Sequence, residues 1–472
     1  MNTKQKRNSG RIDFIADNMR GVTVVSFDPE YLEKDSAVYN HDLAKFCAQL
    51  SLLSYDREIP LSECDYDTGS YIGNTNTKPN VYKVLTALGF ENTEIDISAC
   101  RDGLCYVMAN RKVNVDNKDY DLIFISFVGS VGAQWYSNFD PLGVDSEFEY
   151  SPQEIDRRKS LKSQLHFGFD DARKYVYDRF CDYVDRFMPK LNPERTKVIL
   201  TGHSRGAAAA NLFAMQLINY GENINDGLFP AGRKIANKEN IYTYALATPN
   251  YIRIPKKEQQ EKDPLYCRIF NFENPEDFVT KVLPSEWCDF GKVGTSLVFP
   301  SVDNEPDNYR YYLYRMQKYY ARFSNGEKYH HFPKGEENVY DLVQGIVSKV
   351  HSIDEFYNLK LSLNDMKASV QEFFIMSLCT YLAETGEKQE KANQLMVNAF
   401  AQPVFRAKTS PVILKINDFF VVNEGLSSVP VAGAPFQKYF SQGHMAITYC
   451  SFIMSMNGDE MKFRPSEFYK KP

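Results

Sequence analysis

The sequence predicts an α/β fold in which a mainly parallel β-sheet is covered by helices on both faces. Three observations lead to this expectation. Short apolar, β-branched segments alternate with longer segments of helical periodicity from about residue 30 to residue 284. These apolar segments read as buried strands, as expected of a sheet with two covered faces. One of them passes through a sharp glycine-bounded turn directly into an alanine-rich helical segment.

The first elements follow in chain order. The apolar segment 22–27 is expected to form a short strand, and residues 42–55 place apolar side chains at helical spacing on one face. Residues 81–90 predict a second helix. The segments 104–109 and 122–127 have the alternation of a β-hairpin, with polar turn residues between them.

The later elements alternate between helix and strand. Residues 169–188 predict an amphipathic helix, which Pro189 ends. Buried strands are expected at 197–200, 241–246 and 267–272. Strands joined through helices need crossover connections, which is why we expect these strands to be parallel.

The chain of 472 residues is long enough for more than one structural unit. After the alternating region the character changes: residues 309–320 are dense in tyrosine, and 366–385 and 388–400 have helical periodicity. The expected parts are an N-terminal polar segment (1–29), the α/β core (30–294), a mostly helical insertion or cap (295–435) and a C-terminal core segment (436–472).

Composition excludes several classes of protein. A net charge of −6 provides no basic field for nucleic acid. The nine cysteines are odd in number and show no repeated spacing, so we expect neither a disulfide framework nor a metal site, and no cofactor. No window approaches the ~20 apolar residues that a transmembrane helix needs. No signal peptide is recognisable at the N-terminus, and a cytoplasmic location is the default expectation.

Residues 198–210 carry the pattern that indicates a chemistry. An apolar strand enters Gly202-His203-Ser204-Arg205-Gly206, and four alanines follow. In α/β-hydrolases the nucleophilic serine lies at such a turn, where neighbouring side chains would collide and glycines are needed. The following helix directs its N–H groups and the positive end of its dipole at the reacting atoms. The sequence therefore predicts Ser204 as a nucleophile, against the alternative of an ordinary turn serine.

A serine hydroxyl needs a base to remove its proton and a carboxylate to orient that base. In this fold class the acid follows the serine in the chain, and the histidine follows the acid. Asp277 lies just past an apolar strand, where such acids are found, with Glu273 and Glu276 as local alternatives.

Four histidines follow the acid in the chain, and His444 fits the base best. It follows Gly443 and precedes an apolar segment, so it lies in a loop next to a packed element. The alternative is a buried structural histidine. The remaining candidates are His330, His331 and His351. We expect His203 to pack beside the nucleophile and His166 to be structural.

The oxyanion formed at a carbonyl needs N–H or O–H donors held in place. The residue after the nucleophile, Arg205, supplies one through its backbone. Ser130 follows the apolar strand 123–127 and a glycine, which makes it the candidate for the second.

Together these motifs resemble the class 3 (fungal-type) lipase family, and within it a bacterial lipase-like branch. The segments that carry the resemblance are Phe127-Val128-Gly129-Ser130, Trp135 and Asp140, His166-Phe167-Gly168-Phe169, Gly202 to Gly206, Tyr244 to Pro249, Asp277-Phe278-Val279 with Pro284, and His444 with Tyr449. The resemblance covers roughly residues 40–285 and the C-terminal histidine segment. It implies an ester hydrolase with Ser204, Asp277 and His444 as the catalytic triad and an oxyanion hole formed by Ser130 and Arg205.

The chain departs from the family pattern in three places. Val128 stands where the family has arginine, Arg205 stands where it has leucine, and the acid-to-base distance in sequence is far longer than in compact members. The segment 143–165, where such lipases carry a lid, is rich in charge. An ester or lipid-like small molecule is the expected substrate, and this charge favours a soluble or short-chain ester. The alternatives are an acyltransferase or amidase with the same triad, or a non-catalytic lipid-binding or interaction protein.

Overall fold

The computed structural model describes residues 8–16, 19–55, 64–65, 70–71, 79–96, 102–130, 138, 151–153, 155–156, 165–224, 227–230, 232–253, 264–277, 279–281, 290–301, 305–329 and 442–465. The helices expected at 366–385 and 388–400 lie outside these residues. So do His330, His331, His351 and most of the segment 143–165.

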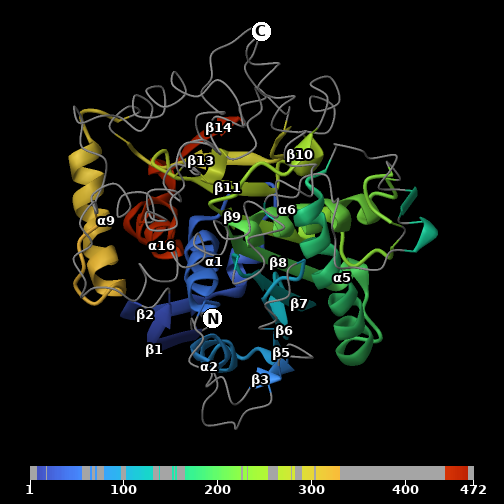
Figure 1. Ribbon diagram of the computed structural model, residues 1–472. Coiled ribbons are helices and arrows are strands. Elements are labelled where there is room, and N and C mark those ends of the chain that lie inside the picture. The colour runs from blue at the N-terminus through green and yellow to red at the C-terminus, as the bar shows by residue number, and fades with distance from the viewer. Residues whose placement is uncertain are drawn as a thin grey trace, which may run out of the picture.

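Ten of the described strands form one sheet with the order β14-β13-β11-β9-β8-β7-β6-β5-β4-β3 (Figure 1). Its centre, from β7 to β13, is parallel throughout, whereas β3 to β7 and β13 to β14 pair antiparallel. The strands are β3 (Cys64–Asp65), β4 (Ser70–Tyr71), β5 (Glu91–Asp96), β6 (Tyr106–Val115), β7 (Lys118–Phe127), β8 (Thr196–His203), β9 (Ile241–Leu246), β11 (Ile269–Glu273), β13 (Thr295–Val298) and β14 (Lys462–Pro465).

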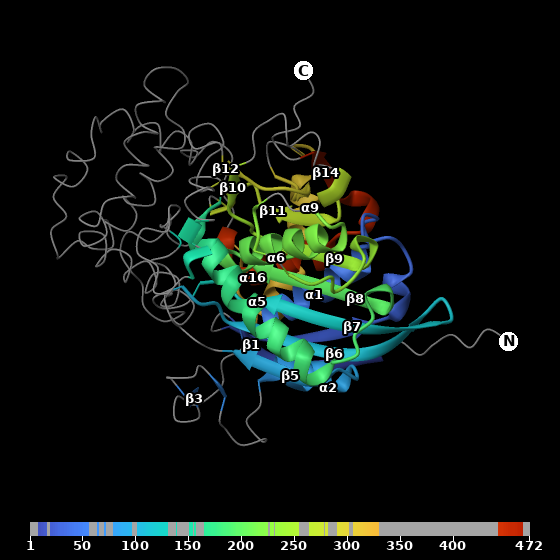
Figure 2. The ribbon, with the colours of Figure 1, turned by 90° about the vertical axis from the view of Figure 1, so that its right-hand side faces the viewer.

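Helices cover both faces of this sheet, as Figure 2 shows for α5 and α6 in front of the strands. The helices are α1 (His41–Leu53), α2 (Asn80–Ala87), α5 (Phe167–Phe187), α6 (Arg205–Gly221), α9 (Tyr309–Phe323) and α16 (Ala446–Ser455). One core contains the buried residues of α1, α2, α9 and α16, and the other contains those of α5 and α6. The predicted fold class, an α/β-hydrolase with a mainly parallel sheet, is confirmed.

The alternation along β7 explains how one strand serves two cores. Leu122 and Phe124 belong to the core under α1, whereas Ile123 and Ile125 belong to the core under α5 and α6. Successive side chains of a strand point to opposite faces, and each fully buried side chain of this size contributes about 1.5–3 kcal/mol. A continuous apolar segment is therefore the pattern that a doubly covered strand requires.

The hairpin of β6 and β7 is longer than predicted. Its turn consists of Asp116 and Asn117 alone, with φ angles of 49° and 58°, and Val115 pairs directly with Lys118. Two successive residues in the left-handed region make the tight turn whose twist matches that of the strands, and Asp and Asn tolerate this region well.

Two parts of the chain differ from the expected organisation. In the N-terminal segment, β1 (Asn8–Ala16) pairs antiparallel with β2 (Met19–Phe27), so the structure there extends beyond the short strand predicted. At the other boundary, β13 lies between β11 and β14 in the main sheet, although residue 295 was expected to begin the helical insertion. The extent of that insertion stays a prediction.

Shorter elements complete the described structure. They are η1 (Pro29–Leu32), η4 (Pro193–Arg195), η5 (Lys238–Asn240), η6 (Val279–Lys281), η8 (Gly458–Glu460) and the two-stranded pair of β10 (Ile252–Arg253) with β12 (Phe290–Gly291). Among the helices of the described residues, none has the length and apolarity that crossing a bilayer demands.

The start of α6 packs so closely on β7 that its glycine cannot be replaced without a shift. A Cβ on Gly206 would lie 2.2 Å from the carbonyl oxygen of Phe127, a backbone atom that cannot rotate away. We expect Gly206→Ala to lower the free energy of unfolding by about 1–3 kcal/mol in urea titrations. Gly458→Ala is the control, because the nearest atom there is a side-chain carbon of His41 at 3.2 Å. Equal effects of the two variants would contradict this account.

Candidate active site

Ser204 lies at the turn between β8 and α6 in a strained backbone conformation. Its φ of 57° and ψ of −127° are unusual for a residue with a side chain and persist only where the surroundings fix them. A Cβ on Gly202 would lie 2.7 Å from the carbonyl oxygen of Gly206, and a Cβ on Gly206 would lie 2.2 Å from that of Phe127, which is why both positions are glycine. The turn leaves Ser204 almost buried, at the N-terminus of α6.

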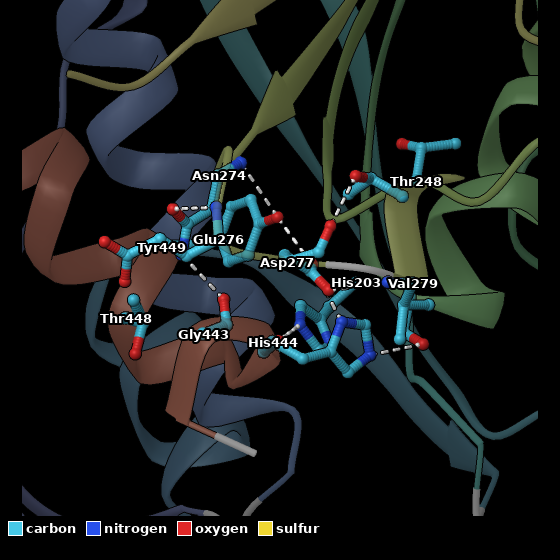
Figure 3. A network of polar contacts seen from close by, with 12 residues as sticks. His203, Thr248, Asn274, Glu276, Asp277, Val279, Gly443, His444, Thr448 and Tyr449 are labelled. Atoms are coloured by element: carbon cyan, nitrogen blue, oxygen red, sulfur yellow. Dashed lines mark hydrogen bonds and ion pairs between the residues drawn. The ribbon is translucent and has the colours of Figure 1, made fainter. Parts of the chain in front are cut away.

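The imidazole of His444 lies between the serine and a carboxylate. Figure 3 shows the ring beside Asp277. Its Nε2 is 2.9 Å from Ser204 Oγ, and its Nδ1 is 2.9 Å from Asp277 Oδ2. A carboxylate only accepts hydrogen bonds, so Nδ1 donates to Asp277. In a neutral ring Nε2 is then the acceptor for the Ser204 hydroxyl, which is the arrangement of a general base facing a nucleophile. The structure therefore brings together the three residues that the sequence singled out.

Asp277 is fully buried, and three donors satisfy its carboxylate. Oδ2 accepts from His444 and from the Tyr449 hydroxyl at 2.7 Å, and Oδ1 accepts from the backbone N–H of Val279 at 2.9 Å. Burying a charged carboxylate is costly unless such hydrogen bonds replace water. Burial and the nearby Asp277 raise the pKa of Tyr449 well above its usual value, so Tyr449 stays protonated and donates.

Asn274 ties the loop of the acid to the segment of the base. Its backbone N–H donates to Tyr449 Oη at 3.1 Å, and its side-chain amide donates to the carbonyl of Gly443 at 2.9 Å. Gly443 also approaches the backbone of Glu276, where a Cβ would lie 3.1 Å from the carbonyl oxygen. These contacts fix the histidine segment against the acid loop, although the two are far apart in sequence.

The two rival carboxylates are engaged elsewhere. Glu273 lies 3.0 Å from Lys292 Nζ. Glu276 accepts hydrogen bonds from the hydroxyls of Tyr309 and Tyr329, both at 2.9 Å. Both glutamates therefore anchor the acid loop to its neighbours, while Asp277 alone of the three hydrogen-bonds to the imidazole.

The two predicted oxyanion-hole residues lie at the same edge of the sheet. Ser130 follows β7, Arg205 begins α6, and β7 and β8 pair in parallel with Phe127 opposite Gly202. Asn138, which sequence reasoning missed, lies between them: its amide donates to Ser130 Oγ at 2.7 Å and accepts from Arg205 Nη1 at 3.0 Å.

The guanidinium of Arg205 is buried and directed at Asn138. His166 also contacts Asn138. Its Nε2 lies 3.0 Å from the Asn138 carbonyl oxygen, and its ring stacks on Phe169. The interpretation of His166 as structural agrees with these contacts. No local pattern singled out Asn138, because its partners come from three separate parts of the chain.

His203 packs beside the nucleophile, as expected. Its Nδ1 lies 2.7 Å from the Tyr55 hydroxyl and its Nε2 lies 2.6 Å from the carbonyl oxygen of His444. Burial, together with the neighbouring His444 ring, lowers the pKa of His203 well below its usual value. His203 is thus neutral at physiological pH. Within the described residues no cluster of three or more His, Cys, Asp or Glu side chains could hold a metal ion.

The fold is that of an α/β-hydrolase, and one part of the chain matches a known family. Residues 124–287 match the sequence model of the lipase (class 3) family. This span begins in β7 and includes Ser204 and Asp277. The predicted resemblance to class 3 lipases is therefore confirmed over these residues.

Solved structures similar to this chain include fungal lipases. A deletion mutant of the Rhizomucor miehei lipase propeptide complex has 20% identity, covers 56% of this chain and 68% of its own, and has a TM-score of 0.32. The Rhizomucor miehei triacylglyceride lipase has 19% identity and a TM-score of 0.27. The match covers 42% of this chain and 63% of the length of that lipase. A mutant of MDLA from Penicillium cyclopium has 18% identity, coverages of 55% and 80%, and a TM-score of 0.30. Comparison with curated proteins gives no match.

The lowered pKa of His203 predicts how stability depends on pH. In the unfolded chain a histidine takes up a proton near pH 6.5, whereas folded His203 stays neutral, so below that pH the unfolded state binds more protons. The free energy of unfolding should therefore fall as the pH drops below about 6.5, with His203 contributing up to about 1.4 kcal/mol per pH unit. Urea unfolding of wild type and His203→Gln at several pH values below 6.5 measures the contribution of His203 to the free energy of unfolding. Parallel curves for the two proteins would contradict it.

Proposed function

We propose that this chain is a serine carboxylic ester hydrolase of the lipase or esterase type, with Ser204 as nucleophile, His444 as base and Asp277 as acid. The observation that supports this most directly is the pair of 2.9 Å hydrogen bonds on the His444 ring, one to the serine hydroxyl and one to the carboxylate. The match of residues 124–287 to class 3 lipases supports the same chemistry.

In the proposed reaction, Ser204 Oγ attacks the ester carbonyl while His444 Nε2 takes the hydroxyl proton. The resulting imidazolium is stabilised by the buried carboxylate of Asp277. The tetrahedral intermediate expels the alcohol, which receives the proton from His444, and an acyl-Ser204 ester remains. Water then attacks this ester with His444 again as base, which releases the acid and restores the serine.

The negative charge on the tetrahedral intermediate needs donors that are already in place. We assign them to the backbone N–H of Arg205, at the positive end of the α6 dipole, and to Ser130 on the neighbouring strand end. Ser130 Oγ accepts the hydrogen bond from Asn138 through a lone pair. This bond does not use the hydroxyl hydrogen of Ser130, which can therefore donate to the oxyanion.

The serine test uses a fluorophosphonate probe, which reacts covalently with activated serine hydroxyls. Ser204→Ala should abolish labelling and reduce ester hydrolysis by about 10⁴-fold or more, and His444→Ala should do nearly the same. Ser36→Ala is the matched control, because this buried serine donates to the carbonyl oxygen of Lys238, before the start of β9, rather than to the site. Labelling that survives Ser204→Ala would overturn the proposal.

The substrate class follows from the family and from the charged segment 143–165, which includes Glu147, Glu149 and Arg157. We propose an ester with a short or soluble acyl group, since opening onto bulk lipid calls for a broad apolar surface. Hydrolysis of p-nitrophenyl esters should therefore be fastest for short acyl chains and show no jump when the substrate forms a separate phase. Rates that increase with acyl length and jump at an interface would contradict this.

A further inference from the structure

Tyr55 and His203 connect three parts of the candidate site. The backbone N–H of Gly129, next to Ser130, donates to Tyr55 Oη at 2.9 Å. That hydroxyl lies 2.7 Å from His203 Nδ1, and His203 Nε2 lies 2.6 Å from the carbonyl oxygen of His444. His203 itself directly precedes the nucleophile. One continuous series of hydrogen bonds thus runs from Gly129, beside Ser130, to the backbone of His444, and it passes through the residue before Ser204.

The chemistry of the partners fixes the direction of every bond in this series. The carbonyl oxygen of His444 can only accept, so Nε2 of His203 carries the hydrogen. Because His203 is neutral, its Nδ1 has no hydrogen and must accept. Tyr55 therefore donates to Nδ1, and its oxygen accepts from Gly129. The direction of each bond in the series therefore matches the protonation states of the two groups that form it.

The groups that face His203 are consistent with a neutral ring. Tyr55 comes from the end of α1, while His444 and Tyr449 come from the C-terminal segment, with ring centroids 5.6, 4.9 and 6.0 Å from that of His203. A second positive ring beside His444 would oppose the imidazolium that forms there when Ser204 loses its proton. Neutrality of His203 thus also favours the proposed base.

A second observation shows that the backbone is built around the Tyr55 hydroxyl. A Cβ on Gly129 would lie 2.0 Å from Tyr55 Oη, so only glycine lets this hydroxyl reach the N–H. The end of α1 is also fixed to β7 next to it, because the hydroxyls of Ser54 and Ser126 are hydrogen-bonded at 2.8 Å.

We propose that Tyr55 and His203 are positioning residues, which hold the proposed oxyanion donor Ser130, the nucleophile and the base at fixed distances from one another. The proposal rests on the function proposed for Ser204. Neither residue contacts the substrate in this account. Their loss should slow the attack by Ser204 and leave substrate affinity nearly unchanged, because only the geometry of the reacting groups changes.

The structure supplies a matched control for the key variant. The Tyr39 hydroxyl lies 2.7 Å from His41 Nδ1, and His41 Nε2 lies 2.7 Å from the carbonyl oxygen of Met456. This tyrosine, histidine and carbonyl repeat the arrangement of Tyr55, His203 and His444 at a place that does not contact Ser204. Tyr39→Phe therefore removes the same kind of bond without touching the candidate site.

We expect Tyr55→Phe to lower kcat and the rate of fluorophosphonate labelling by about 10- to 100-fold, with KM within about twofold of wild type. Tyr39→Phe should leave all three unchanged, while the thermal midpoints of the two variants fall by similar amounts. In a double-mutant cycle, Tyr55→Phe combined with His203→Gln should slow labelling no more than the slower single variant, since both break one series of bonds. Equal kinetics of Tyr55→Phe and wild type, or independent effects in the cycle, would overturn the proposal.

A measurement without activity separates this proposal from the one on function. Nitrogen-15 NMR of labelled histidine rings should show His203 as the neutral Nε2–H tautomer near pH 7, with the Nδ1 signal shifted in Tyr55→Phe. An Nδ1–H tautomer or an imidazolium would overturn the series of bonds even in an active enzyme. Absence of labelling in wild type, with the expected tautomer present, would instead refute the proposed role of Ser204 and leave the series of bonds supported.

Discussion

The site depends on the close packing of the β8–α6 turn against the end of β7. Phe127 pairs with Gly202, and its carbonyl oxygen leaves no room for a side chain on Gly206. This contact holds Ser204 in its strained conformation, and it places the first N–H groups of α6 and the residues after β7 at one edge of the sheet. A parallel pair of strands buried on both faces is what makes such a contact rigid.

His444 and Asp277, the proposed base and acid, come from distant parts of the chain, and buried polar contacts hold them together. Tyr449 and Asn274 connect the two segments at the place where Asp277 is fully buried. In an interior of low polarity these hydrogen bonds do two things at once. They offset the cost of burying the carboxylate, and they leave the His444 ring a single orientation in which it meets both neighbours.

How much of this could be predicted from sequence depended on whether the signal was local. Ser204 was predicted because local sterics demand glycines on either side, and Asp277 because acids of this kind follow a strand end. Tyr55 and Asn138 carry no such signal, since each becomes important only when tertiary packing brings a distant partner to it. The same holds for β14, whose short segment becomes a strand through pairing with β13.

The two tyrosines that donate hydrogen bonds to Glu276 couple the stability of α9 to that of the loop that carries Asp277. Tyr309 begins α9 and Tyr329 follows its end, and both hydroxyls share the carboxylate of the residue that directly precedes Asp277. Detachment of α9 from the body of the protein would cost this loop two hydrogen bonds. The segment 309–329 is therefore thermodynamically linked to Asp277, whose carboxylate hydrogen-bonds to the imidazole of His444.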